Sequence, residues 1–239
     1  MVASISTHKN TYAGAEIYCL GAGASLNYLD PAYFADKLVV AVNESAQAFG
    51  IKPLAIVLKE HRESLAMAYS AFPDVPLIVS RWPYGDPNRG FPPLEETPYA
   101  SIPTVAVFDH EANQSGAFDA ERDWPTDPDA LVVSMSTITS AMHFAAYLGA
   151  KTIILVGHDC GQVGTEGPYV KGYGQAEAQM GYAPQQLAWL TSIERQSRAV
   201  KAQLVARYGV SVLSLSPFLS PHMDGVPFDG GTVQINMPA

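Results

Sequence analysis

The stretch that decides the fold is VVSMSTITSAMHFAAYLGAKTIILVGHDCG, residues 132–161. Its hydroxyl-rich start leads into apolar residues at positions 141, 144, 145 and 148, and this spacing is the period of one helix face. Gly149 supplies a left-handed helix stop, and Thr152–Val156 is too apolar to be half exposed. The stretch therefore predicts a capped helix followed by a central strand of a parallel sheet.

The polar turn GHDCG, residues 157–161, follows this strand and should lie at the carboxyl edge of the sheet, where open α/β folds bind ligands. His158 is the first candidate for a general base, because an imidazole titrates near neutral pH; the alternative is a histidine hydrogen-bonded into the turn. Asp159 is the residue that we most expect to be functional. Three roles are open to it: it orients His158 or a backbone amide of the glycine-rich turn described next, it holds a metal ion, or it caps a nearby helix or loop.

The glycine-rich turn is GAGASL, residues 21–26. It follows the apolar strand Glu16–Leu20 and leads into a helix that begins near Ser25. Such a turn lets backbone N–H groups approach a ligand closely, and a helix N-terminus favours negative charge, so the turn predicts phosphate binding. The third glycine of the dinucleotide-binding pattern is absent, and a tight turn without a ligand is the alternative.

Two further strands end in polar residues at the same expected edge. Leu38–Val42 ends at Asn43 and Glu44, and Glu44 is within range of the position where dinucleotide-binding folds use a carboxylate to bind a ribose hydroxyl. Leu54–Leu58 ends at KEHR, residues 59–62, in which His61 is the second candidate for a catalytic base. Burying all four of these polar side chains would cost too much free energy, so some of them should face solvent or a ligand. A solvated turn is the alternative interpretation for the glutamate and the arginine.

The remaining chain completes one α/β domain, residues 1–239, with a mainly parallel sheet between helices. Residues 1–14 carry no period and predict a loose arm, whereas residues 83–130 predict an insertion or lid that forms one wall of the site. A glycine- and tyrosine-rich loop at 162–183 is typical of segments that close over substrates. The other expected elements are helices at 63–72 and 185–208 and strands at 77–80, 104–108 and 210–215.

The composition of the chain limits the classes of partner that it is expected to bind. The chain has 14 Lys and Arg against 23 Asp and Glu, a formal charge of -9, and no basic cluster, which disfavours a nucleic acid polymer but not a single nucleotide. No apolar run approaches the roughly 20 residues of a membrane-spanning helix, so we expect a soluble, cytoplasmic protein. Cys19 and Cys160 are expected to be buried thiols. The acidic residues between 109 and 129 follow no ligand spacing, so we predict no metal site there.

Three segments together resemble two known families. They are IYCLGAGASL at 17–26, VVAVNES at 39–45 and TITSAMHFAAYLGAKTIILVGHDCG at 137–161. Their order and motifs are similar to the DUF115 family, which includes MptE-like 6-hydroxymethylpterin diphosphokinases, and to the sialyltransferases of glycosyltransferase family 42. The final helix, strand and Ser-Pro turn, ending at residue 217, also fit this pattern.

The resemblance implies a Rossmann-like, three-layer α/β fold and a nucleotide-using transferase. In such an enzyme Asn43 would hydrogen-bond the nucleoside, and Asp159 matches the family's own aspartate. Glu44 is also an expected nucleotide contact, because of its position at a strand end. The other expected nucleotide contacts are Gly21, Ala22, Gly23, Ser25, Thr139, Ser140, Tyr169 and Tyr173.

The chain departs from the family pattern at the position of the catalytic base. The sialyltransferases place a histidine before the last helix, and this chain has none there. His158 is the natural substitute, ahead of His61 and of His143, which we expect to pack within its helix. Alanines also stand at positions 22 and 24, where the family turn commonly has Asn or Pro, and Thr137 stands where the family has arginine.

Three functions remain open at this point. The first is a sialyltransferase-like glycosyltransferase that uses a nucleotide-sugar donor such as a CMP-sugar. The second is an MptE-like diphosphokinase, which needs ATP and Mg²⁺ and acts on a pterin-like small molecule. The third is a nucleotide-binding protein without catalysis. The acceptor is not named by any motif, and a homo-oligomer stays an open alternative.

Overall fold

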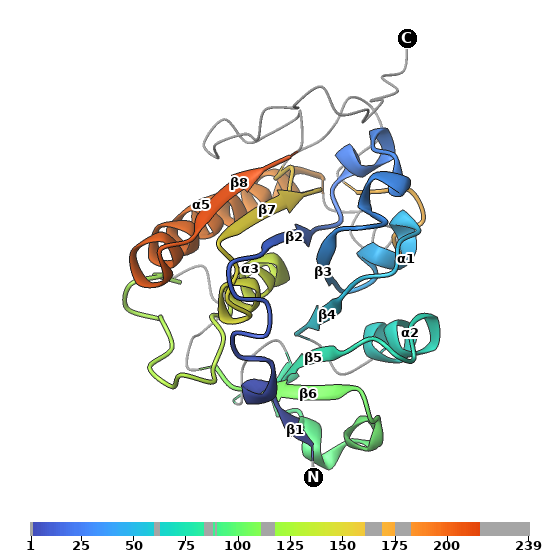
Figure 1. Cartoon of the computed structure of the whole chain (residues 1–239), viewed down its shortest axis with the longest axis vertical. Helices are drawn as coiled ribbons and strands as arrows, with labels where there is room; N and C mark the ends of the chain where they lie inside the picture. The colour runs from blue at the N-terminus through green and yellow to red at the C-terminus, as the bar shows by residue number, and fades with distance from the viewer. Residues whose placement is uncertain are drawn as a thin grey trace.

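The computed structural model describes residues 2–59, 63–83, 88, 90–110, 118–160, 169–174 and 183–215, with the backbone alone for 63 and 183–191. Its described strands form one open sheet in the order β1-β6-β5-β4-β3-β2-β7-β8 (Figure 1), and every neighbouring pair is parallel. The strands are β1 (Ala3–Ser4), β2 (Glu16–Leu20), β3 (Leu38–Val42), β4 (Ala55–Leu58), β5 (Leu77–Ser80), β6 (Val105–Phe108), β7 (Thr152–Val156) and β8 (Ser211–Ser214).

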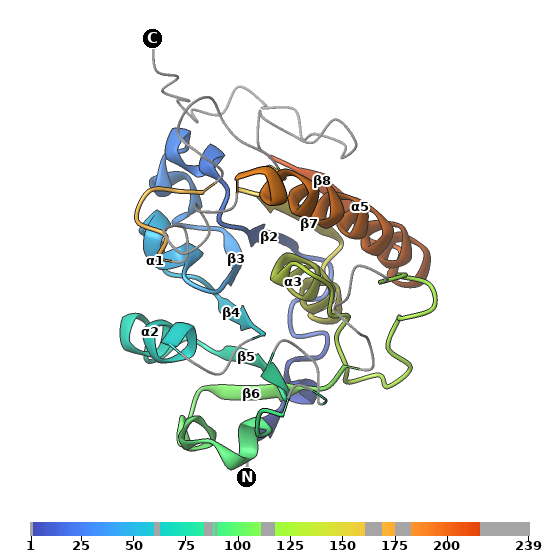
Figure 2. The same cartoon turned by 180° about the vertical axis from the view of Figure 1, so that it is seen from behind.

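Helices cover both faces of this sheet, because successive residues of its strands point to opposite sides. Ile17 and Cys19 of β2 belong to one core, which they share with α3 (Thr137–Tyr147) and α5 (Ala183–Tyr208). Figures 1 and 2 show these two helices on one side of the sheet and α1 and α2 on the other. The second core is shared with α1 (Ser45–Phe49), α2 (Glu63–Ala71) and the 3-10 helices η2 (Ala24–Tyr28), η3 (Pro31–Phe34) and η6 (Leu94–Glu96). The expected three-layer, Rossmann-like arrangement is thus confirmed.

The strand order reverses once at β2. From β2 the chain winds outward through β3, β4, β5 and β6, and it then returns through α3 to β7 on the other side of β2. Ligands of open α/β sheets bind at the carboxyl ends of the strands that flank such a reversal. Because α3 precedes a parallel strand, its first residues also lie at this carboxyl edge. The topology therefore places the candidate site between the ends of β2 and β7.

The expectation of a loose arm at residues 1–14 is wrong. Strand β1 pairs with β6, and Ile5 is fully buried. The backbone N–H groups of Asn10 and Tyr12 donate to carbonyls at the C-terminal end of α3 (Thr137–Tyr147), at 3.0 and 2.8 Å. The 3-10 helix η1 (Ile5–His8) connects these contacts. A two-residue strand is too short to carry a period, which is why the sequence pattern does not show it.

The stretch 83–130, expected as an insertion or lid, divides into parts with different roles. Helices η6 and η7 (Pro98–Ser101) join β5 to β6 in the manner of an ordinary crossover, and β6 itself is an interior strand. After the gap at 111–117, Phe118 and Ala120 are buried in the core of α3 and α5. Strand β7 is interior as expected, although it is second from the sheet edge rather than at the centre.

Candidate functional site

The turns after β2 and β7 are in direct backbone contact. The N–H of Gly21 donates to the Val156 carbonyl and that of Gly23 to the Gly157 carbonyl, both at 2.7 Å. A Cβ at Gly21 would lie 2.4 Å from the Gly157 oxygen, and Gly157 itself has φ +63°. Side chains other than hydrogen are therefore excluded by the approach of the two turns, and the glycines need no ligand to explain them.

Asp159 occupies the anion-binding position at the start of η2. Its Oδ2 accepts the Ser25 backbone N–H at 2.7 Å, and its Oδ1 accepts the Ser25 hydroxyl at 2.5 Å. The carboxylate is buried, and a Cβ at Gly23 would lie 2.4 Å from Oδ2. Of the roles open to Asp159, the observed contact fits two: it orients a backbone amide of the glycine-rich turn, and it caps the first turn of η2. Among the described residues no group of three or more His, Cys, Asp and Glu side chains is placed to hold a metal ion.

His158 faces the opposite way from Asp159, toward α5. Its Nε2 lies 3.0 Å from the hydroxyl of Ser197, and the Cys160 sulfur lies 3.4 Å from the same nitrogen. Burial lowers the pKa of His158 to about 4, and burial, with the charges of Glu194 and Asp159, raises the pKa of the Cys160 thiol to about 12. Both groups are therefore neutral at neutral pH, and the imidazole is a weak base in this arrangement.

Two polar side chains, those of Asn43 and Glu44, directly follow β3. Asn43 has φ +49°, and its side-chain amide donates to the Tyr173 hydroxyl at 3.3 Å. Glu44 is 6% exposed; its Oε1 accepts the Ser64 hydroxyl at 3.2 Å, whereas its Oε2 has no hydrogen-bond partner within the described part of the chain. Leaving a buried carboxylate oxygen unpaired is costly, so a hydrogen-bond donor that reached this oxygen would be favoured there.

A short segment, residues 169–174, lies across the glycine-rich turn. Tyr169 forms a bridge with Gly23, and the N–H of Val170 donates to the Ala22 carbonyl at 2.9 Å. The rings of Tyr169 and Tyr173 are stacked with centroids 5.5 Å apart. Burial and the charge of the glutamate at the end of β3 raise the pKa of Tyr173, so its phenol stays protonated and keeps a hydrogen to donate. The structure thus brings the two predicted tyrosines to the predicted turn.

Two predicted pocket residues at the start of α3 are fully buried. The Thr139 hydroxyl donates to the Ser136 carbonyl and the Ser140 hydroxyl to the Val132 carbonyl, both at 2.8 Å, and neither side chain is exposed. Their hydrogen bonds stabilise the backbone at and before the start of α3. His143 packs as expected: its Nδ1 accepts the Val132 N–H, and burial lowers its pKa to about 3. His61 lies outside the described residues.

Lys59 is the residue whose role the sequence did not reveal. It directly follows β4, it is 6% exposed, and its ammonium donates to the carbonyls of Ser134 and Met135 at 2.7 and 3.0 Å. The lysine therefore holds the loop that enters α3 and adds a positive charge beside the N-terminus of that helix. A lysine immediately after an apolar strand was the available clue, since burial of this side chain requires nearby acceptors.

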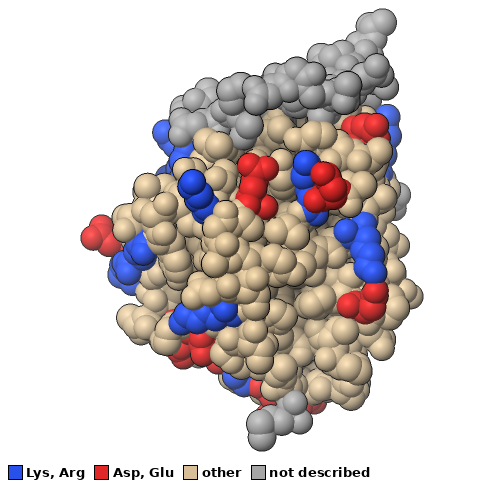
Figure 3. Space-filling model, viewed as in Figure 1, with Lys and Arg blue, Asp and Glu red and all other residues tan. Residues whose placement is uncertain are grey.

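Charged side chains of both signs lie on the face of the molecule that Figure 3 shows. Figure 3 shows basic and acidic side chains interspersed on one face, without a continuous basic area. In the described part of the chain no helix is both long and apolar enough to cross a membrane.

Comparisons with known proteins add a distant likeness. No protein-family model matches the chain, and no curated protein matches it. Among solved structures, the monofunctional alpha-2,3-sialyltransferase Cst-I from Campylobacter jejuni is similar over 95% of this chain and 83% of that chain, with a TM-score of 0.40 and 15% sequence identity. A likeness this weak carries no conclusion about activity, so the function is argued from the site itself.

Proposed function

We propose that the carboxyl edge around β2, β3 and β7 binds a nucleotide, and that the protein transfers a sugar from a nucleotide-sugar donor. The observation that carries this proposal is the unpartnered oxygen of Glu44 beside the amide of Asn43 and the phenol of Tyr173. An acceptor, an amide and a hydroxyl gathered at one strand end suit the hydroxyl and amino groups of a nucleoside.

In this proposal the phosphates of the donor do not bind at the glycine-rich turn, where the sequence predicted them. The donors at Ser25 are already used by Asp159, and a second anion beside that carboxylate would be repelled. The N-terminus of α3, which begins after Ser136, lies at the same edge and has the ammonium of Lys59 behind it. Helix N-termini favour phosphate, so we assign the donor phosphates to this helix.

The acceptor hydroxyl needs a base, and His158 remains the candidate under a specific condition. Its ring must leave Ser197 and gain solvent before its pKa can approach its ordinary value, because burial is what lowers that pKa. Asp159 then acts as a positioning residue that holds the turn after β2 against the end of β7.

The test is a thermal-unfolding screen of the full chain with CMP, UDP, GDP and ATP, each with and without Mg²⁺. A ligand at 100 times its Kd stabilises a protein by about 2.7 kcal/mol, which such a screen resolves. Metal-independent stabilisation by CMP, with release of CMP from a CMP-sugar, supports glycosyl transfer. Metal-dependent ATP binding supports the diphosphokinase alternative instead. Binding without turnover of any donor supports a non-catalytic nucleotide-binding protein, and no binding at all overturns the proposal.

A further inference from the structure

The segment 169–174 carries an aromatic pair beside the proposed nucleotide site. The rings of Tyr169 and Tyr173 are tilted by 25° with their centroids 5.5 Å apart, which is the offset-stacked arrangement that aromatic pairs prefer. Tyr173 is 6% exposed and its hydroxyl accepts a hydrogen bond from the side-chain amide of Asn43, whereas Tyr169 is only partly buried. Tyr173 is therefore the inner ring of the pair, and Tyr169 is the outer ring, with surface that solvent reaches.

The backbone around Tyr169 is fixed on the glycine-rich turn. Tyr169 forms an antiparallel bridge with Gly23, and the Val170 N–H donates to the Ala22 carbonyl at 2.9 Å. The Tyr173 N–H donates to the Val170 carbonyl at 3.2 Å, which ties the second ring to the first. These contacts are made by the backbone, so a change of the Tyr169 side chain leaves them in place. The outer ring is thus held in position without a ligand, which lowers the entropic cost of binding on it.

A fixed and partly exposed aromatic ring beside hydrogen-bonding groups suits a nucleobase. Bases stack on aromatic side chains through their π faces, and removal of one such ring weakens binding by roughly 5- to 150-fold per base. The inner ring of the pair contacts Asn43, and the next residue in the chain is Glu44, with one oxygen unpartnered among the described residues. An amide and a carboxylate at a strand end suit the hydroxyl groups of the ribose that carries the base.

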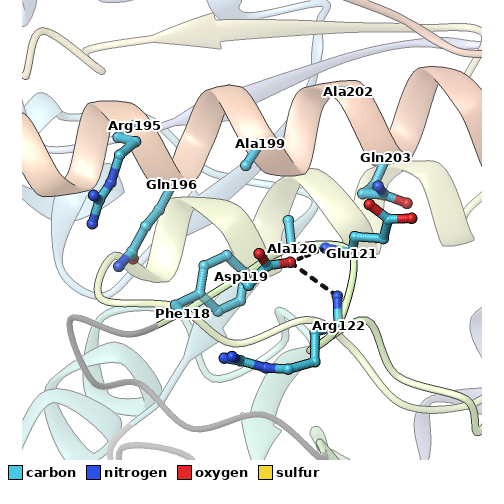
Figure 4. Close-up of a pocket in the computed structure, with 10 residues that line it drawn as sticks. All are labelled: Phe118, Asp119, Ala120, Glu121, Arg122, Arg195, Gln196, Ala199, Ala202 and Gln203. Atoms are coloured by element: carbon cyan, nitrogen blue, oxygen red, sulfur yellow. Dashed lines mark hydrogen bonds between the residues drawn. The ribbon is translucent and has the colours of Figure 1, made fainter.

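A cavity elsewhere in the molecule has no comparable surface. It has a volume of about 580 Å³ and lies between α5 and the loop 118–122 (Figure 4). Acidic and basic side chains are mixed around it, and its aromatic lining residue, Phe118, is buried. None of its described lining residues directly follows a strand. The base is therefore assigned to the segment 169–174 and not to this cavity.

We propose that the nucleobase of the bound nucleotide stacks on the outer face of Tyr169, with the ribose at Asn43 and Glu44. This inference rests on the proposed nucleotide site and gives that site a surface for the base. The contribution of Tyr169 comes from its ring and not from its hydroxyl, because stacking uses the π face. Tyr169 therefore favours a nucleotide over the same sugar phosphate without a base.

The test is calorimetric titration of the full chain with CMP, UMP, GMP and AMP and with ribose 5-phosphate, which lacks the base. The nucleotide that binds most tightly should bind at least about tenfold more tightly than ribose 5-phosphate, a comparison that needs no substitution. Tyr169→Leu keeps an apolar side chain but removes the ring, so affinity for this nucleotide should fall about tenfold while affinity for ribose 5-phosphate stays the same. Tyr169→Phe keeps the ring and should bind the nucleotide within about twofold of the unmodified protein.

Tyr99→Leu is the matched control. Tyr99 is also partly buried against the second core, but it lies in η7, on the crossover between β5 and β6, so nucleotide affinity should not change. Three results overturn this inference and leave the proposed nucleotide site standing: unchanged nucleotide affinity in Tyr169→Leu, an equal loss in Tyr169→Phe, or nucleotide binding no tighter than that of ribose 5-phosphate. Binding of none of the four nucleotides overturns the proposed function, and this inference with it.

Discussion

The ends of β7 and β3 each place a buried carboxylate at the carboxyl edge of the sheet, and the protein uses the two groups in opposite ways. Both oxygens of Asp159 accept hydrogen bonds from Ser25, whereas one oxygen of Glu44 has no partner among the described residues. The first carboxylate is saturated by the fold and the second is not. Position at a strand end therefore does not by itself identify a ligand-binding acid, and the proposed function distinguishes the two carboxylates by their remaining hydrogen-bonding capacity.

The largest expected effect on stability tests the saturated end. Asp159→Asn places an amide N–H or a neutral oxygen where Ser25 offers two donors, so at least one charge-assisted hydrogen bond is lost. We expect the free energy of unfolding to fall by about 2–4 kcal/mol, measured by urea denaturation. Asp36→Asn, at an exposed carboxylate, is the control and should change it by less than about 0.5 kcal/mol. Wild-type stability of Asp159→Asn would show that the two strand ends do not differ.

The second effect concerns pH and again belongs to the end of β7. The pKa of His158 is about 4 in the folded protein and 6.5 as its ordinary value, so between these values the unfolded chain binds more protons. The stabilising contribution is therefore complete above pH 6.5 and is lost as the pH falls through 6.5 toward 4, up to about 3 kcal/mol. In His158→Gln this part of the pH dependence should vanish, as measured by unfolding curves from pH 7 to 4. An identical slope in the variant would mean that the ring is already exposed to solvent.

The third effect separates backbone from side chain at the end of β3. Asn43 has a positive φ that alanine tolerates poorly and glycine tolerates well. Asn43→Ala should lower the free energy of unfolding by about 1 kcal/mol and Asn43→Gly by less. Both should weaken binding of the nucleotide found in the screen by the same amount, about 1–3 kcal/mol, because both remove the amide. Wild-type affinity in Asn43→Gly would remove this side chain from the site.

The smallest effect on stability is expected at the unsaturated carboxylate. Glu44→Gln keeps an oxygen for Ser64 and removes no hydrogen bond from the unpartnered oxygen. We expect the free energy of unfolding to change by less than about 1 kcal/mol while nucleotide affinity falls about tenfold, both measured on the same preparation. A loss of stability as large as that of Asp159→Asn would show that Glu44 is saturated in solution, and the contrast between the two ends would be broken.

Sequence reasoning predicted strands of the sheet but not which distant residues contact one another. Runs such as Leu38–Val42 and Thr152–Val156 gave their strands to the residue, since an apolar run between turn residues is a local pattern. The pairing of Asp159 with Ser25 joins residues 134 positions apart, and no local pattern shows it. The opposite directions of His158 and Asp159 were also beyond the sequence, because their partners, Ser197 and Ser25, lie far away along the chain. Lys59 was hidden for the same reason: its acceptors come from a loop 75 residues later.

The contact between the turns after β2 and β7 has a consequence for inheritance. Glycine is required at positions 21 and 23 by the approach of the Gly157 carbonyl, and at position 157 by its positive φ and the Leu26 side chain. Ser25 and Asp159 satisfy each other's hydrogen bonds. These five positions form a single spatial constraint, so they should be gained and lost together during divergence, while the residues at the end of β3 that we propose to face a nucleotide drift independently. A paired pattern, Gly-x-Gly-x-Ser joined to a distant Gly-x-Asp, would then mark descendants of this architecture whose substrates have already changed.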